Sequence, residues 1–172
     1  TYSGNTVNGL PVYYGVTESG GTLDLASYAQ IILLNCTFMD IVGTTVGQVS
    51  APVQVFYCTN ITISGFNSAA NGRTITAYET DNITITDITS VGRYVEWEFT
   101  AAGIRLAYCD NFYIVNFDHS EEGYGIYLSF SNYGSVISCD VDNARRGIYV
   151  YEGQNVIVDN CEITNMLYHG IY

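Results

Sequence analysis

The sequence of 172 residues contains no lysine, and its five arginines are set against 17 aspartates and glutamates, a formal charge of −12 at pH 7. Phosphate recognition needs clustered cations, so this balance argues against nucleic-acid binding. The longest apolar run is four residues, as at 31–34, which is too short for a membrane-spanning helix. Only 13% of the residues are charged and 48% are hydrophobic, which also excludes a disordered acidic tail.

Tyrosine and glycine are abundant instead, with 16 and 17 copies. Together with many Thr, Val and Ile residues they favour short strands joined by tight turns. The length is typical of one domain. The sequence begins with Thr1 rather than Met. We therefore expect either a leader peptide that has been removed or a fragment of a longer protein.

A repeat of about 22 residues runs along the chain. Gly-Ile dipeptides recur at this spacing, at Gly103, Gly125, Gly147 and Gly170. Each unit also has an apolar residue followed by a second one five places later, in the pairs Leu33/Phe38, Ile61/Phe66, Ile83/Ile88, Phe112/Phe117, Val136/Val141 and Val158/Ile163. Strands this short cannot bury a face alone, but the stacked coils of a solenoid can.

The repeat therefore predicts an all-β solenoid of six to seven coils over residues 21–172, with neighbouring coils roughly 4.8 Å apart. Residues 1–20 are predicted to form an N-terminal cap. An insertion at 91–101 lengthens one repeat to 29 residues. Because the coils stack, residues at equivalent positions of successive coils form columns, and each column can be interpreted as one feature of the surface or core.

The Gly-Ile strands, the turn Asn and the following Ile-x-Ile resemble the right-handed parallel β-helix repeats of the pectin-lyase-like superfamily. The segments 7–14 and 29–36 are similar to the start of archaeal surface β-helix proteins labelled NosD-like. The resemblance covers nearly the whole chain. It implies a single-stranded right-handed parallel β-helix and does not specify an activity.

The catalytic elements of enzymes in this superfamily are not found in the sequence. Polygalacturonases carry the elements Asn-Thr-Asp, Asp-Asp and Arg-Ile-Lys, and none of the three occurs in this sequence. Pectate lyases use basic residues that include lysine, and this sequence contains no lysine. We therefore expect no enzyme activity, no cofactor and no metal; scattered His and Met residues do not support copper binding. Asp81 and Asp110 occupy one turn column and fit either a cation site or solvated turn residues.

Three glycosylation sequons begin at Asn35, Asn60 and Asn82. They fit N-glycans on a secreted protein. The alternative is an Asn column that bonds neighbouring turns, since Asn111 keeps the Asn but lacks the following Thr. Both interpretations stay open.

The five cysteines fall into two predicted columns. Cys36, Cys139 and Cys161 lie three places after the first apolar residue of their units, and Cys58 and Cys109 lie three places before it. Cys139 and Cys161 occupy consecutive coils, so they are candidates for a disulfide, although we favour stacked free thiols. Five is an odd number, so at least one thiol stays reduced.

The loops that follow the second apolar residue are predicted to emerge along one edge, which also holds both histidines. Glu121 and Arg145 have equivalent positions in neighbouring loops, and so have Glu122 and Arg146. We interpret them as salt bridges between coils, worth about 0–1 kcal/mol each, rather than as a catalytic cluster.

Tyr127, Tyr149 and Tyr172 each follow the Ile of a Gly-Ile pair, so their rings are predicted to stack on the outward face of one sheet. With Trp97 of the insertion they form a candidate contact surface for a neighbouring subunit or a sugar.

The sequence thus predicts a secreted structural β-solenoid of the cell surface. The chain ends as a seventh coil begins, so unless it is a fragment we expect another copy to cover that edge, giving a head-to-tail filament or surface-layer subunit. The alternatives are a polysaccharide lyase or hydrolase using Glu96, Glu98, Glu121 and Glu122, and a glycan-binding adhesin module. Few charges remain on the sheets, so we also expect the surface to tolerate acid.

Overall fold

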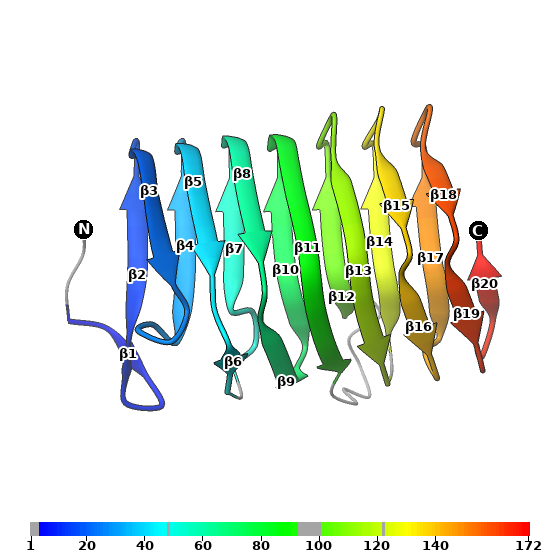
Figure 1. Cartoon of the computed structure of the whole chain (residues 1–172), viewed down its shortest axis with the longest axis horizontal. Helices are drawn as coiled ribbons and strands as arrows, with labels where there is room; N and C mark the ends of the chain where they lie inside the picture. The colour runs from blue at the N-terminus through cyan, green and yellow to red at the C-terminus, as the bar shows by residue number, and fades with distance from the viewer. Residues whose placement is uncertain (1–3, 48, 93–100, 122) are drawn as a thin grey trace.

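The computed structural model describes residues 4–47, 49–92, 101–121 and 123–172. Within these ranges the regular structure consists of β-strands, which stack as coils along one axis with the two termini at opposite ends (Figure 1). The described part of the chain contains no helix that could cross a membrane.

The coils build two sheets. Over the described residues, sheet 1 has nine strands, in the order β1 (Thr6–Val7), β2 (Leu10–Val16), β4 (Gln30–Leu34), β7 (Val53–Phe56), β10 (Arg73–Tyr78), β12 (Ala102–Ala107), β14 (Tyr124–Ser129), β17 (Arg146–Tyr151) and β20 (His169–Ile171). Sheet 2 has eleven, β3 (Ser19–Asp24), β5 (Thr37–Val42), β6 (Thr45–Val46), β8 (Thr59–Ser64), β9 (Asn67–Asn71), β11 (Asp81–Gly92), β13 (Tyr113–Ser120), β15 (Ser135–Ile137), β16 (Asp140–Asp142), β18 (Ile157–Asp159) and β19 (Glu162–Thr164).

Strand pairing is parallel throughout the coils, and only β1 runs antiparallel to its neighbour β2 among the described strands. Ile104 pairs with Ile126 and Ile126 with Ile148, so the Gly-Ile repeat sets the register of sheet 1 as predicted. Parallel pairing already begins at Val12, which pairs with Gln30. The first coil therefore starts inside the segment 1–20 that the sequence assigns to a cap.

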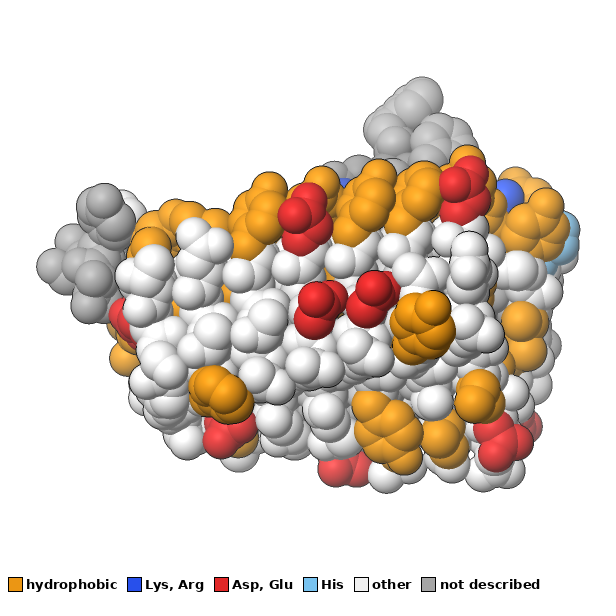
Figure 2. Space-filling model, turned by 90° about the horizontal axis from the view of Figure 1, so that it is seen from above, with side chains coloured by type: hydrophobic (Ala, Val, Ile, Leu, Met, Phe, Trp, Pro, Cys, Tyr) orange, Lys and Arg blue, Asp and Glu red, His pale blue; other side chains and the backbone are white. Residues whose placement is uncertain are grey.

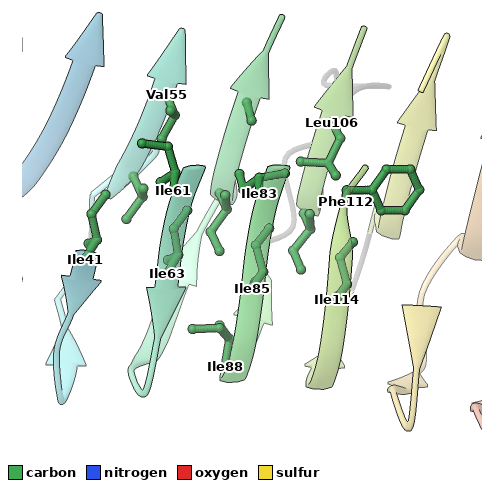
Figure 3. Close-up of a cluster of buried hydrophobic side chains, with 14 of the residues drawn as sticks. Ile41, Val55, Ile61, Ile63, Ile83, Ile85, Ile88, Leu106, Phe112 and Ile114 are labelled. Carbon is green, nitrogen blue, oxygen red and sulfur yellow. The ribbon is translucent and has the colours of Figure 1, made fainter. Parts of the chain in front are cut away.

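One apolar core lies between the two sheets (Figure 3). Val55 and Leu106 from sheet 1 are fully buried, as are Ile63, Ile85 and Ile114 from sheet 2. Alternate residues of each strand point into this core, so the other residues of both sheets point outward. Each outward column is consequently a row of side chains at the spacing of the coils.

The turn asparagines occupy a left-handed backbone conformation. Asn60, Asn82 and Asn111 have φ of 55°, 53° and 56°, and Phe38 and Tyr133 have φ of 54° and 55° at equivalent positions. Asn tolerates this conformation better than most residues because its short polar side chain bonds locally. The backbone conformation accounts for the Asn column whether or not any member carries a glycan.

The predicted alignment of sheet 2 is two residues out in its C-terminal half. Val136 pairs with Ile114, not with Phe112 as the apolar spacing suggested. The position next to Phe112 is held by Gly134, where a Cβ would lie 2.3 Å from the Phe112 ring. The Phe112 ring occupies the core space that a side chain at residue 134 would fill. The second coil therefore has a glycine where the repeat predicts an apolar residue.

The first repeat is misaligned as well. Met39, not Leu33, pairs with Ile61, and Leu33 instead pairs with Val55 in sheet 1. Phe38, interpreted as a core residue, is 63% exposed.

Candidate functional site

The outward side of β12, β14 and β17 carries a surface that we call the tyrosine–arginine face; it consists of Arg105, Tyr124, Tyr127, Arg146 and Tyr149 and continues to Tyr172. The rings of Tyr127 and Tyr149 are stacked, with centroids 5.4 Å apart and planes 8° apart. Tyr149 and Tyr172 are stacked at 5.2 Å and 2°. The predicted stacking along one sheet is therefore present in the structure.

Two arginines lie against these rings. Arg146 donates a hydrogen bond to the Tyr124 hydroxyl, and its guanidinium carbon is 5.3 Å from the Tyr124 ring centre and 4.9 Å from that of Tyr149. The guanidinium carbon of Arg105 is 5.8 Å from the Tyr127 ring centre. Burial is the main cause that raises the pKa of Tyr127, so its hydroxyl remains a neutral donor. The face thus combines fixed cations with phenol groups.

The register does not align the residues of the predicted salt bridges between coils. Arg146 pairs with Tyr124, two residues beyond Glu122, which itself lies outside the described residues. Arg145 donates its backbone N–H to the Gly123 carbonyl and is thus two residues out of register with Glu121. The misplaced marker at Val136 shifted both alignments by two residues. Arg146 contacts tyrosines where a carboxylate was predicted, and the salt bridge between Glu121 and Arg145 stays a prediction.

A second aromatic surface follows the turn between the two sheets (Figure 2). This aromatic corner consists of Tyr57, Tyr78, Tyr108, Phe130 and Tyr151, whose successive ring centroids are 5.7, 5.5, 4.8 and 5.5 Å apart. Three of the rings, at Tyr57, Tyr108 and Tyr151, are exposed. The sequence analysis missed this corner, although an aromatic residue directly before Cys58, Cys109 and Ser131 was the available signal.

Carboxylates flank the aromatic corner, as the red side chains among the orange ones in Figure 2 show. Hydrogen bonds to Glu79 and Glu152 are the main causes that raise the pKa values of Tyr78 and Tyr151. The corner is therefore acidic as well as aromatic.

Asp81 and Asp110 act as acceptors between turns. Asp81 accepts a hydrogen bond from the backbone N–H of Asp110 at 3.0 Å. Asp110 in turn accepts bonds from the backbone and side-chain nitrogens of Asn132 at 3.0 and 2.9 Å. Of the two predicted alternatives, these contacts favour turn residues. Among the described residues no group of three or more His, Cys, Asp or Glu side chains is arranged to hold a metal ion.

Cys36, Cys58 and Cys109 lie in one inward column at a turn. The backbone N–H of Cys36 donates to the Cys58 sulfur at 3.2 Å, and the same bond recurs from Cys58 to Thr80 and from Cys109 to Ser131. The assignment of Cys36 to the other column was wrong, because the first repeat was misaligned. These small side chains satisfy the backbone N–H of the preceding coil.

Cys139 and Cys161 occupy consecutive coils as predicted, and all five cysteines are free thiols in the structure. Burial raises the pKa of Cys139 to about 12, and of Cys58 and Cys109 to about 11. Since the thiolate is the reactive form, buried thiols with raised pKa values are inert.

We expect Ellman's reagent at pH 8 to detect at most one thiol in the folded protein, at the half-buried Cys161, and five after denaturation. The variant Cys161→Ser is the control and should abolish the reaction of the folded protein. Only three thiols in denaturant without reductant would instead show that Cys139 and Cys161 form a disulfide.

A chain of polar side chains runs inside the solenoid. It consists of Ser68, Thr74, Ser90 and His119, each 1% or 2% exposed. The Thr74 hydroxyl bonds to Ser90 at 2.6 Å and donates to Ser68 at 3.2 Å, and Ser90 bonds to Nδ1 of His119 at 3.2 Å. The sequence analysis placed His119 on an exposed loop edge, which is wrong: it lies on β13 and points inward beside Phe117.

His119 is only partly satisfied. Its Nε2 has no hydrogen-bond partner among the described residues. Burial lowers the pKa of His119 to about 4, so the ring is neutral at pH 7. A neutral, enclosed imidazole cannot reach an external substrate, and we assign it to the interior of the fold.

The remaining candidates are the asparagines of the sequons and the residues of the insertion. Asn35 and Asn82 are exposed and Asn60 is half-buried, so glycosylation at these residues stays a prediction. Trp97, Glu96 and Glu98 lie outside the described residues.

Comparison with known proteins gives one match. A family model described as a right-handed beta helix region matches residues 53–172. No curated protein and no solved structure matches the chain.

Proposed function

The chain belongs to the right-handed β-helix family, and on that premise we propose that it is a structural β-solenoid that assembles with copies of itself on an extracellular surface. Family membership and the stacked parallel coils confirm the predicted right-handed β-helix. The resemblance to NosD-like proteins stays a prediction. The fold alone does not select a function, so the proposal depends on the surface.

The observation that carries the proposal is the row of stacked tyrosines on the tyrosine–arginine face. Tyr127 and Tyr149 are outward, in register and only partly buried. Aromatic residues and arginine are enriched in protein contacts, and here both types are held on one sheet. A rigid row of this kind loses little side-chain entropy when a partner binds. These properties favour a contact surface, and the hydroxyl-rich, lysine-free composition is consistent with the extracellular location we propose.

We expect the purified chain to form regular fibres or sheets as its concentration rises. Sedimentation velocity and negative-stain electron microscopy would measure this. The double variant Tyr127→Thr/Tyr149→Thr should stay monomeric, because it lacks the stacked rings of the contact surface. Its fold should persist, because the same column already contains Thr76.

The matched control is Tyr113→Thr, an exposed tyrosine on β13 of sheet 2, which should assemble like the unmodified chain. Circular dichroism would verify the fold of each variant. Wild-type protein that remained monomeric at high concentration would contradict the proposal, and so would assembly of the double variant at the wild-type concentration.

A second candidate function is glycan binding at the aromatic corner. Its support is specific: exposed Tyr57 and Tyr108 both contact the ring of Tyr78, whose hydroxyl bonds to the carboxylate of Glu79. Sugar sites combine aromatic rings with such acceptors. Calorimetric titration with neutral and acidic polysaccharides would detect such binding. Release of reducing ends in the same samples would favour the carbohydrate-active enzyme over the structural role.

A further inference from the structure

Charge is divided between the two sheets. The strands of sheet 1, as the structure describes them, contain Arg73, Arg105 and Arg146 and no Asp or Glu. Those of sheet 2 contain no Arg and nine acidic residues: Asp24, Asp40, Asp81, Asp87, Asp118, Asp140, Asp142, Asp159 and Glu162. Because both sheets enclose one core, the strands of one side of the solenoid carry only cations and those of the other side only carboxylates, while Glu79 and Glu152 border sheet 1 at the aromatic corner.

Three of the acids on sheet 2 form what we call the acidic ladder. Asp118 pairs with Asp140 and Asp140 with Glu162, and all three side chains are exposed. The pKa of Asp118 is raised, first by partial burial and then by the charge of Asp140. Like charges in register destabilise a sheet, so a partner that places cations beside the ladder would reduce the repulsion between its carboxylates.

The tyrosine–arginine face is better suited to carboxylates than to sugar rings. The faces of Tyr127 and Tyr149 are turned toward each other in a near-parallel stack, so a sugar cannot lie flat on them. The hydroxyl is the far end of each tyrosine side chain, and the guanidinium groups of Arg105 and Arg146 lie over the rings of Tyr127 and Tyr149. A row of donors and cations remains, which a row of carboxylates complements.

We propose that the tyrosine–arginine face of one copy binds the acidic ladder of a second copy, so that solenoids associate side by side. This rests on the proposed function and names the two surfaces of the assembly. Both rows repeat at the spacing of the coils, roughly 4.8 Å, so donors and acceptors coincide over several coils. The two surfaces belong to different sheets, so each copy keeps one of them free for a further neighbour. Such a contact propagates and gives an open assembly rather than a closed dimer.

A charge-reversal experiment tests this pairing. Arg105→Glu places a carboxylate on the face beside the remaining Arg146 and leaves the ladder acidic. Asp140→Arg leaves the face cationic and places a cation in the middle of the ladder. Each variant alone should need a concentration about tenfold higher or more to assemble, because like charges meet. An equimolar mixture should assemble near the wild-type concentration, with the two variants alternating.

Asp40→Arg is the matched control. It makes the same charge change as Asp140→Arg on an exposed residue of sheet 2, on β5 rather than in the ladder, and should assemble like the wild type. Circular dichroism would verify that each variant folds, and the uncharged Arg105→Gln and Asp140→Asn would give smaller effects of the same sign.

The outcomes separate the two proposals. Recovery of assembly only in the mixture supports the pairing. Wild-type assembly that neither reversal alters overturns the pairing and leaves the proposed function in place. Absence of wild-type assembly overturns both. A last outcome combines three results: the wild type binds polygalacturonate, Arg105→Glu abolishes that binding, and the mixture does not recover assembly. In that case the face binds a polyanion and the pairing is wrong.

Discussion

Lowering the pH from 6.5 to 4 is expected to reduce the free energy of unfolding by about 3 kcal/mol through His119 alone. Burial lowers the pKa of His119 to about 4, against an ordinary value of 6.5. Below pH 6.5 the unfolded chain binds a proton that the folded chain does not accept. The stabilisation is therefore complete above pH 6.5 and is lost as the pH falls toward 4.

Urea unfolding followed by circular dichroism at several pH values would measure this loss. His119→Asn keeps a hydrogen-bonding group beside Ser90 but does not titrate, so its stability should vary less with pH over this range. His169→Asn, which replaces the exposed histidine of β20, is the control and should keep the wild-type slope. Equal slopes for wild type and His119→Asn would show that His119 is not the titrating group.

This expectation limits the acid tolerance predicted from composition. Ser90, Phe117 and Gly103 pack against His119 in the described structure and carry no charge. The backbone of Glu121 raises the pKa of His119, but it offsets only part of the effect of burial. The carboxylates of the surface become neutral near pH 4, which lowers repulsion, but the interior loses stability over the same range. We expect the protein to stay soluble in acid while its unfolding midpoint in urea falls.

How far the sequence predicts the fold depends on which residues set the register. The Gly-Ile pairs locate the last four strands of sheet 1, β12, β14, β17 and β20, because each of these keeps a glycine and an isoleucine there, and Ile104, Ile126 and Ile148 do pair. In sheet 2 a large side chain of one coil packs over a glycine of the next: the Phe112 ring fills the space above Gly134. Apolar residues therefore no longer mark equivalent positions in these coils. Such compensation between coils is visible only in three dimensions.

The same limit explains the candidate site. Stacking of Tyr127 and Tyr149 follows from one spacing within sheet 1 and was predicted correctly. The placement of Arg146 depended on the sheet 2 markers and was wrong. His119 was interpreted as a loop residue because an inward column of polar side chains has the sequence pattern of a surface. Its hydrogen bond to Ser90 makes burial tolerable, and single-sequence periodicity does not report such bonds.

The Gly-Ile glycines are expected to be indispensable where the coils are closest, so Gly125→Ala should lower the free energy of unfolding by about 3 kcal/mol. A Cβ at Gly125 would lie 2.5 and 2.7 Å from the two methyl carbons of Val141 and 2.8 Å from the Gly147 carbonyl oxygen. The backbone contact cannot be relieved by a rotamer change, so the coils themselves would have to separate.

The chain supplies a matched control in the same column. At Gly170 the nearest atom to a Cβ is the Ile163 methyl at 3.5 Å, an ordinary contact, so Gly170→Ala should change stability by less than about 1 kcal/mol. Adding Val141→Ala to Gly125→Ala removes the side-chain clash and leaves the carbonyl contact, so the double variant should stay less stable than Val141→Ala alone. Urea unfolding of the wild type and the four variants measures these differences. Equal losses for Gly125→Ala and Gly170→Ala would mean that the repeated glycine reflects strand propensity and not the close approach of neighbouring coils.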